Sequence, residues 1–187
     1  MSLGLIYGTV ALVDHDSEWE TIADQTIESL WRVFGSVATD IQHIGSTAVN
    51  GIKAKPSIGI VVAVNHLEFI ESLFPAMEQE GFIFTYGYKE DEWKIIIYTD
   101  KSHSIETHSI LIVKHDNPRY MESLCFRDYL NANPTAAKRY EIHKLKIAAK
   151  SNNDRSVYKT NKSDFMKCLL EEAMIWSSDK IAFWEKM

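Results

Sequence analysis

The chain has 187 residues, of which 45% are hydrophobic and 25% charged, and its formal net charge at pH 7 is −6. This size suits one domain with a substantial core, and the acidic balance argues against a protein that coats nucleic acid through bulk positive charge. The two cysteines, Cys125 and Cys168, lie far apart, and the N-terminus shows no secretory pattern. We therefore expect buried free thiols, a cytoplasmic location and no membrane partner.

The N-terminal region predicts a short strand and then a helix. Residues 8–13 are typical of a strand, and Ser17 offers an N-cap, with Glu20 completing a capping box. Apolar residues between Trp19 and Phe34 recur at helical spacing. This pattern predicts an amphipathic helix with one buried face.

Strand patterns dominate the next hundred residues. Runs rich in Ile and Val predict strands at 39–44 and 57–64. A helix is predicted over 66–80, which Pro75 must kink or split, because proline cannot donate a backbone hydrogen bond inside a helix. Three further strands are predicted in the segments FIFTYGY (82–88), WKIIIYTD (93–100) and IETHSILIV (105–113).

From Pro118 onward the pattern is helical. Helices are predicted over 119–131, from Asn133-Pro134 to about Lys150, and from about Val157 to Trp176. A sheet region followed by a helical block indicates an α+β fold. We expect a single domain over 1–187, with a mixed α/β sheet core in 1–116 and a helical part in 117–187.

One loop between predicted strands, in the segment HIGSTAVNGIKAKPSIGI (43–60), has the features of a phosphate-binding loop. Gly45 would let backbone N–H groups approach a phosphate closely, and the Ser46 hydroxyl adds a donor. Lys53 and Lys55 could supply positive charge. The alternative is ordinary, because Gly-Ser turns and surface lysines are common.

Other motifs are missing. The loop lacks the GK[ST] ending of a P-loop kinase, and no GxSxG motif is present. His103, His108 and His115 do not have zinc-site spacing. His43 either orients the Gly-Ser loop and contacts ligand or is a hydrogen-bonded core residue.

Taken as a whole, the segment resembles the signature of the GrpB family, HIGSTAV-x-G-hydrophobic-x-AKP-x-IDI. Two later segments resemble that family in the same order: FRDYLNANPTAAKRYEIHKLKIA (126–148) and YKTNKSDF (158–165). Together the three segments span roughly Gln42 to Phe165, most of the chain. The GrpB family is placed in the polymerase-beta-like nucleotidyltransferase superfamily.

The resemblance implies a nucleotidyltransferase-like mixed or antiparallel sheet with a C-terminal helical block. It places Gly45, Ser46 and Thr47 beside a bound nucleotide, with carboxylates on the next strand holding Mg²⁺. It also suggests that Arg127 faces the phosphates, although this residue could instead anchor its helix to the sheet. The remaining residues assigned by resemblance are Lys146 and the i, i+4 pair Tyr158 and Lys162, which would close over a base or phosphate or else face solvent.

The chain departs from the family pattern where metal chemistry is expected. Gly59 stands where the family usually has Asp, and Val61 where the wider superfamily often has a second carboxylate. Glycine has no side-chain donor and cannot replace a metal ligand. Glu106 on a later strand is the substitute acid to consider. If the pocket keeps its geometry, Gly59→Asp would then raise Mg²⁺ affinity.

Smaller departures concern charged groups near the loop. Gln42 stands where Glu is frequent, and Asn131 and Asn133 stand where Arg and His are typical. The two asparagines remove cationic donors, which suggests a modified ligand.

Three functions stay open. The first is a pocket for a nucleotide or another phosphorylated small molecule, with catalysis reduced or lost. The second is an active nucleotidyltransferase that needs Mg²⁺ and uses Glu106, and the third is a non-catalytic interaction scaffold. Fusion of some relatives to dephospho-coenzyme A kinase links the family to coenzyme A metabolism by association, and the terminal segment IAFWEKM leaves homo-oligomer formation open.

Overall fold

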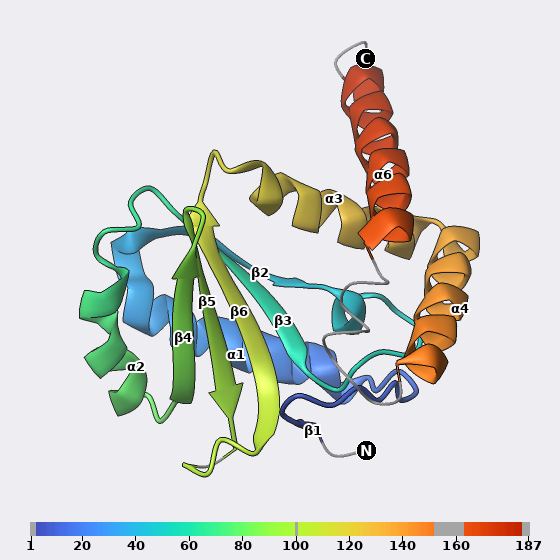
Figure 1. Cartoon of the computed structure of the whole chain (residues 1–187). Helices are drawn as coiled ribbons and strands as arrows, with labels where there is room; N and C mark the ends of the chain where they lie inside the picture. Colours follow the sequence, from blue (N-terminus) through green and yellow to red (C-terminus); the bar gives the residue numbers. More distant parts are fainter. Residues whose placement is uncertain (1–2, 100, 152–162, 185–187) are drawn as a thin grey trace.

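The computed structural model describes residues 3–99, 101–151 and 163–184. A mixed sheet lies at the centre, with helices on both of its faces (Figure 1). The strands are β1 (Leu5–Ile6), β2 (Ala38–Ile44), β3 (Ile58–Val64), β4 (Ile83–Lys89), β5 (Glu92–Tyr98) and β6 (Ile105–Lys114). The α-helices are α1 (Glu18–Phe34), α2 (Phe74–Gln79), α3 (Pro118–Ala132), α4 (Pro134–Lys150) and α6 (Ser163–Trp184), and short 3₁₀ turns are η1 (Gly35–Val37), η2 (Ser46–Ala48) and η3 (Ile70–Leu73).

The strand order in the sheet is β2-β3-β6-β5-β4, and β1 pairs with β6. The β3–β6 pair is parallel, and the other pairs are antiparallel. This arrangement confirms the expected mixed sheet. It also places β3 and β6, the two strands expected to carry acids, side by side in the middle of the sheet.

The two faces of β3 pack against different helices. Because side chains alternate along a strand, Ile58, Ile60 and Val62 share one face and join the core under α1 and α2. Val61 and Ala63 point to the other face and pack with Tyr120 of α3. The near-continuous apolar run of β3 therefore reflects burial on both sides.

Two predicted elements differ in the structure. The strand predicted at 8–13 is replaced by β1 and an isolated bridge between Val13 and Ala54. The helix predicted over 66–80 is split into η3 and α2, and Pro75 lies in the first turn of α2, where its missing N–H costs no intrahelical hydrogen bond.

The predicted capping box at Ser17 is wrong. The Ser17 side chain makes no cap hydrogen bond, and the Asp16 carboxylate instead accepts a hydrogen bond from the Glu18 amide at 3.1 Å. Cys125 is buried as expected, but Cys168 is exposed, so the predicted burial is wrong for one of the two free cysteines.

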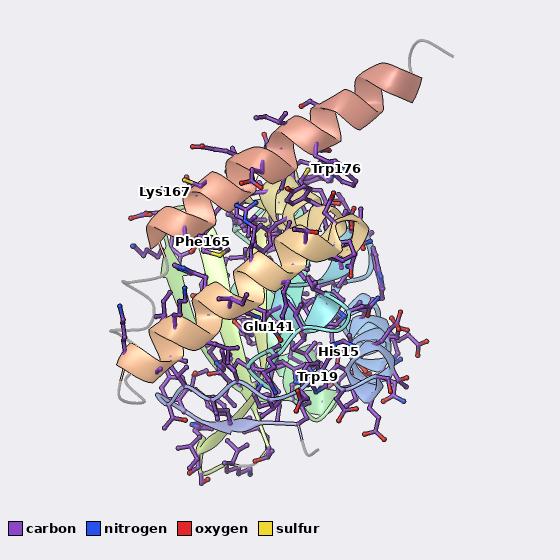
Figure 2. All side chains as sticks on the ribbon, turned by 90° about the vertical axis from the view of Figure 1, so that its right-hand side faces the viewer. His15, Trp19, Glu141, Phe165, Lys167 and Trp176 are labelled. Atoms are coloured by element: carbon purple, nitrogen blue, oxygen red, sulfur yellow. The ribbon has the colours of Figure 1, made fainter. Side chains whose placement is uncertain are left out.

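Helices α3, α4 and α6 form a block that packs on the Gly-Ser loop side of the sheet (Figures 1 and 2). Val49 and Ile52 of the loop are buried in one cluster with Phe126, Tyr140 and Leu169, which come from the three helices. Phe165 of α6 stacks on His143 of α4, and Trp176 of α6 contacts Tyr129 of α3. Figure 2 labels both α6 residues. No helix in the described ranges is long and apolar enough to cross a membrane.

Candidate functional site

The Gly-Ser turn has a backbone conformation that requires glycine. Gly45 has φ 77° and ψ −166°, a region that residues with a side chain essentially never occupy. A side chain there would meet no atom within 4 Å, so the constraint is the backbone and not the space. β2 therefore ends in a sharp change of direction that leads into η2, where the Ala48 amide donates to the Gly45 carbonyl at 3.2 Å.

Side chains hold this turn in place. The Asn131 amide group donates to the Ala48 carbonyl at 2.8 Å, and its oxygen accepts from the Asn50 amide at 3.0 Å. His43 Nε2 lies 2.9 Å from the Thr47 hydroxyl. Asn131 thus serves the backbone of the turn, which explains the asparagine without a modified ligand. Asn133 similarly donates to the Tyr129 carbonyl at 2.8 Å.

The turn borders a cavity that we call the Gly-Ser cleft, with a volume of about 330 Å³. Gly45 and Ser46 form part of its wall, and every other lining residue comes from the sheet or from α3, α4 and α6. Its apolar lining consists of Ile44, Leu111, Phe126, Tyr140, Met166 and Leu170. The polar side chains are those of Ser46, Arg119, Glu122, Ser123 and Lys167.

A second cavity, the His43 cavity, has a volume of about 380 Å³. It is lined by His43, Thr47 and Arg127, together with residues of α1 and α3 and with His15, Gln42, Ala48 and Asn50. The predicted ligand-binding residues are therefore divided: Gly45 and Ser46 line one cavity, whereas these three line the other.

Arg127 anchors α3 to β2. Its Nη1 donates to the Gln42 side-chain oxygen at 3.0 Å and to the His43 carbonyl at 2.9 Å, while its Nε donates to Asp128 at 2.7 Å. These bonds engage much of the guanidinium. The geometry favours the anchoring interpretation of Arg127 over the phosphate-facing one.

His43 is neutral near pH 7. Burial, together with the positive charge of the nearby Arg127 guanidinium, lowers its pKa from 6.5 to about 4. Burial also lowers the pKa of His108 to about 4. His43 can accept or donate a hydrogen bond, but it supplies no positive charge for a phosphate.

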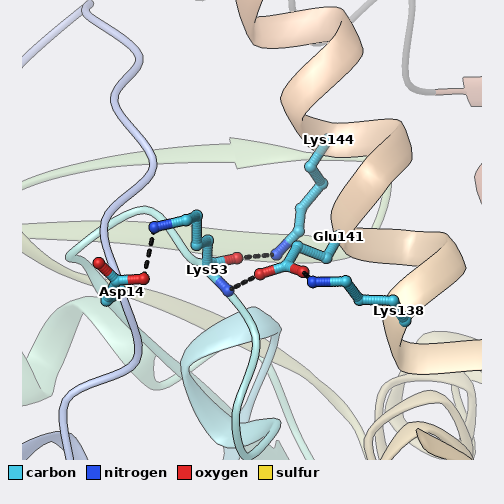
Figure 3. A network of polar contacts seen from close by, with 5 residues as sticks. All are labelled: Asp14, Lys53, Lys138, Glu141 and Lys144. Carbon is cyan, nitrogen blue, oxygen red and sulfur yellow. Dashed lines mark hydrogen bonds and ion pairs between the residues drawn. The ribbon is translucent and has the colours of Figure 1, made fainter. Parts of the chain in front are cut away.

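Lys53 belongs to a network that fastens the loop to α4 (Figure 3). Its ammonium pairs with Asp14, its amide donates to Glu141 at 2.7 Å, and its carbonyl accepts from Lys144 at 2.5 Å. Glu141 and Lys144 are only 3% and 1% exposed. Lys138 also pairs with Glu141. Lys53 thus has a structural role that the sequence did not reveal.

Opposing effects act on the Glu141 carboxyl. Burial raises its pKa, but hydrogen bonds from Lys138 and from the Lys53 amide, with the charge of Lys144, outweigh burial and leave the pKa below its usual value. The carboxylate is therefore ionised at neutral pH.

The family resemblance pointed to Lys146, which is exposed and lines neither cavity, and not to the buried Lys144. The spacing of Tyr140, Lys144 and Ile147 along one helix face could have identified the buried lysine.

Glu106 is a buried carboxylate that pairs with the partly exposed Lys55. Lys55 Nζ lies 2.6 Å from Glu106 Oε1, and the Ser57 hydroxyl donates to the same oxygen at 3.0 Å. Glu106 is 1% exposed. Because a buried carboxylate needs a partner, this pairing accounts for both residues. It argues against Glu106 as a metal ligand and against Lys55 as a phosphate ligand.

At the position expected for the first metal ligand, neighbouring backbone leaves no room for a side chain. Gly59 pairs with Ile44 across β2–β3 and with Ser109 across β3–β6. A Cβ on Gly59 would lie 2.6 Å from the Ile44 carbonyl oxygen, which is closer than side chains approach. The second position, Val61, is fully buried beside Ile44 and Leu111. Within the described ranges, no group of three or more His, Cys, Asp and Glu side chains could hold a metal ion.

The cleft has cationic residues that the sequence did not indicate. Arg119, in the first turn of α3, bonds to Glu92, and Lys167 lies exposed on α6 (Figure 2). Arg119, Ser123 and Phe126 are four and three residues apart, so they share one face of α3. This spacing in the sequence could have indicated that Arg119 lies on the same side of the helix as Phe126.

Tyr158 and Lys162, which were predicted to contact ligand, lie outside the described residues, as do the side chains of 179–187.

Known proteins match most of this chain. A family model described as GrpB protein matches residues 9–172. Glutamate-rich protein GrpB of Alkalihalophilus pseudofirmus is 34% identical over 172 residues, covering 91% of this chain and 99% of that protein. A dephospho-CoA kinase of Mycobacterium bovis is 25% identical over 189 residues, covering 89% of this chain and 46% of that protein, so the chain spans about half of that relative.

Solved structures show the same fold. Conserved protein GrpB from Enterococcus faecalis matches with a TM-score of 0.76 and 24% identity, covering 89% of this chain and 99% of that one. Cid1 poly(U) polymerase with Mg 3′-dATP bound matches with a TM-score of 0.53 and 14% identity, covering 80% of this chain and 49% of that one. The nucleotidyltransferase-like fold is therefore confirmed. The family model spans most of the chain, which therefore belongs to the GrpB family.

Proposed function

We propose that this GrpB-family chain binds a nucleotide or another phosphorylated small molecule in the Gly-Ser cleft, without metal-dependent nucleotidyl transfer. The observation that carries the proposal is the make-up of the cleft wall. A glycine-dependent turn ends β2 there, and Ser46, Arg119 and Lys167 offer donors and positive charge beside an apolar surface. Clefts with a few polar groups on a mainly apolar lining are typical of small-molecule sites.

The fold supports this class of ligand. Cid1, which shares the fold at low sequence identity, is described with Mg 3′-dATP bound. Phe126 and Tyr140 give the cleft of this chain aromatic surface, on which a flat base or a similar ring could pack. Gly45 and Ser46 would contact the phosphate through backbone N–H groups and the serine hydroxyl.

Mg²⁺ does not fit the residues present. Magnesium in nucleotide sites is usually held by one or two carboxylates together with the phosphates. Here Gly59 and Val61 offer none, and Glu106 is engaged by Lys55 and Ser57. Glu122 is the one carboxylate among the described residues that line the cleft, and it belongs to no group of three or more possible metal ligands. The proposal therefore includes no metal-dependent step. The transferase alternative would require Glu106 to exchange these partners for metal.

The remaining hypotheses, a structural scaffold and a link to coenzyme A metabolism, have less support from the structure. A purely structural scaffold would leave the cleft without a ligand. The dephospho-CoA kinase relative makes adenine-containing phosphates reasonable first candidates, although the chain covers only 46% of that protein. Cytoplasmic location and homo-oligomer formation stay predictions.

Isothermal titration calorimetry tests the proposal. We expect at least one nucleoside mono- or triphosphate to bind in EDTA, and Lys167→Glu to weaken that binding about tenfold, because it reverses a charge on the cleft wall. Lys101→Glu is the matched control, since Lys101 is exposed, lies outside the cleft and gives the same change in net charge. Absence of any nucleotide binding, or equal losses in the two variants, would contradict the proposal.

A further inference from the structure

The balance of charge in the Gly-Ser cleft limits how much phosphate it can neutralise. Among the described residues that line it, Arg119 and Lys167 are cations and Glu122 is an anion. One of the two cations is already shared, because Arg119 bonds to Glu92. The charged side chains of the lining therefore have a formal net charge of at most +1.

The charge on the ligand depends on its phosphate chain. A phosphomonoester carries about −1.5 to −2 charges at pH 7. A triphosphate carries more, and nucleotide sites normally neutralise that excess with Mg²⁺ held by carboxylates. Gly59 and Val61 remove such carboxylates here, and no lysine of the loop compensates, because Lys53 and Lys55 pair with Asp14 and Glu106.

The remaining polar groups also suit a single phosphate. Ser46 and Ser123 offer hydroxyl donors, and Glu122 lies one residue before Ser123 on α3. Since a carboxylate repels a phosphate chain that extends toward it, Glu122 would penalise each additional phosphate.

We infer that the ligand of the Gly-Ser cleft carries one phosphate on an apolar or aromatic body, as a nucleoside monophosphate does, and that Glu122 selects against longer phosphate chains. The inference rests on the proposed function and specifies its substrate class. It differs from the chemistry of a transferase, which must accept a triphosphate. Glu122 is a specificity residue and needs no role in any reaction.

The test compares adenosine, AMP, ADP and ATP by calorimetry in EDTA at fixed ionic strength. We expect AMP to bind about tenfold more tightly than ATP, and adenosine to bind more weakly than AMP. Glu122→Gln should reduce the AMP-to-ATP preference to about threefold or less, because it removes the charge and keeps the side-chain shape. Glu78→Gln is the control, since Glu78 is exposed on α2 and lies outside the cleft.

The outcomes separate the two claims. ATP binding as tightly as AMP or more tightly would overturn the inference and leave the proposed function standing. An unchanged preference in Glu122→Gln, or the same change in Glu78→Gln, would overturn the role of Glu122. Failure of all four compounds, and of the other nucleotides, would overturn the proposed function itself.

Discussion

The carbonyl oxygen of Ile44 occupies the space into which a side chain on Gly59 would extend. A Cβ built on Gly59 would lie 2.6 Å from that oxygen, and the two residues are partners across β2 and β3. The departure from the family pattern is therefore more than a missing carboxylate. The end of β2 approaches β3 at this point, so restoring an acid would first require the two strands to separate.

The first prediction concerns the stability of Gly59→Ala. We expect a loss of about 1–3 kcal/mol in the free energy of unfolding, because the added methyl group overlaps backbone that cannot rotate away. Gly87→Ala, on β4, is the control, since a Cβ there meets no atom within 4 Å. Urea denaturation of both variants provides the measurement. Equal stabilities would show that β2 and β3 have room for a side chain.

The same geometry changes the expectation for Gly59→Asp. From the sequence, that substitution should raise Mg²⁺ affinity if the pocket keeps its geometry. With the Ile44 carbonyl in place, the geometry cannot be kept, and we expect destabilisation without a gain in Mg²⁺ binding.

The second prediction concerns the network that fastens the loop to α4. Glu141→Ala should lower the free energy of unfolding by about 3–5 kcal/mol, because it leaves the buried Lys144 and the Lys53 amide without this carboxylate. Glu172→Ala should cost about 1 kcal/mol, because its pair with Arg139 is partly exposed and it accepts one further hydrogen bond, from Tyr129. Urea denaturation again gives both values. Similar losses in the two variants would contradict a structural role for Glu141.

The third prediction concerns the pH dependence of stability. His43 has a folded-state pKa of about 4 against 6.5 as its reference value, so the unfolded chain binds more protons between these values. Stability should therefore be full above about pH 6.5 and fall as the pH drops toward 4, by up to about 3 kcal/mol for this residue. The free energy of unfolding is measured by urea denaturation at pH 7.5, 6 and 5.

Two variants isolate the contribution of His43. His43→Gln should reduce the pH dependence of stability between pH 7.5 and 5 to about half, because the amide does not titrate while His108, whose pKa is also about 4, still does. His66→Gln should leave it unchanged, since His66 is 70% exposed. Glu141 adds to the pH dependence of stability only at lower pH. Because its pKa is lowered in the folded protein, its contribution to stability is lost as the pH falls below the usual pKa of glutamate. A pH dependence that is undiminished in His43→Gln would assign it to other groups, including His108.

Local sequence patterns predicted much of the fold because they depend on neighbours along the chain. The alternation and apolar runs predicted β2 to β6, and helical spacing predicted α1, α3 and α4. Pro75 was predicted to interrupt a helix, and it lies in the first turn of α2.

The partners of the loop lysines could not be predicted in this way. Lys53 pairs with Asp14, which is 39 residues away, and Lys55 with Glu106, which is 51 residues away. A lysine in a polar loop has the same local pattern whether it faces a ligand or a distant carboxylate. The family resemblance located the Gly-Ser turn correctly, but only the fold showed that Lys53 and Lys55 are engaged in ion pairs within the protein.

The most direct test of the central claim is the effect of Mg²⁺ on ATP binding to the unmodified chain, measured by calorimetry in EDTA and in excess Mg²⁺. If the Gly-Ser cleft binds phosphate without metal, ATP binds in EDTA and Mg²⁺ does not lower its dissociation constant. Binding that occurs only when Mg²⁺ is present would contradict the account, because phosphate binding in the cleft is assigned to the protein's own donors and cations, without metal.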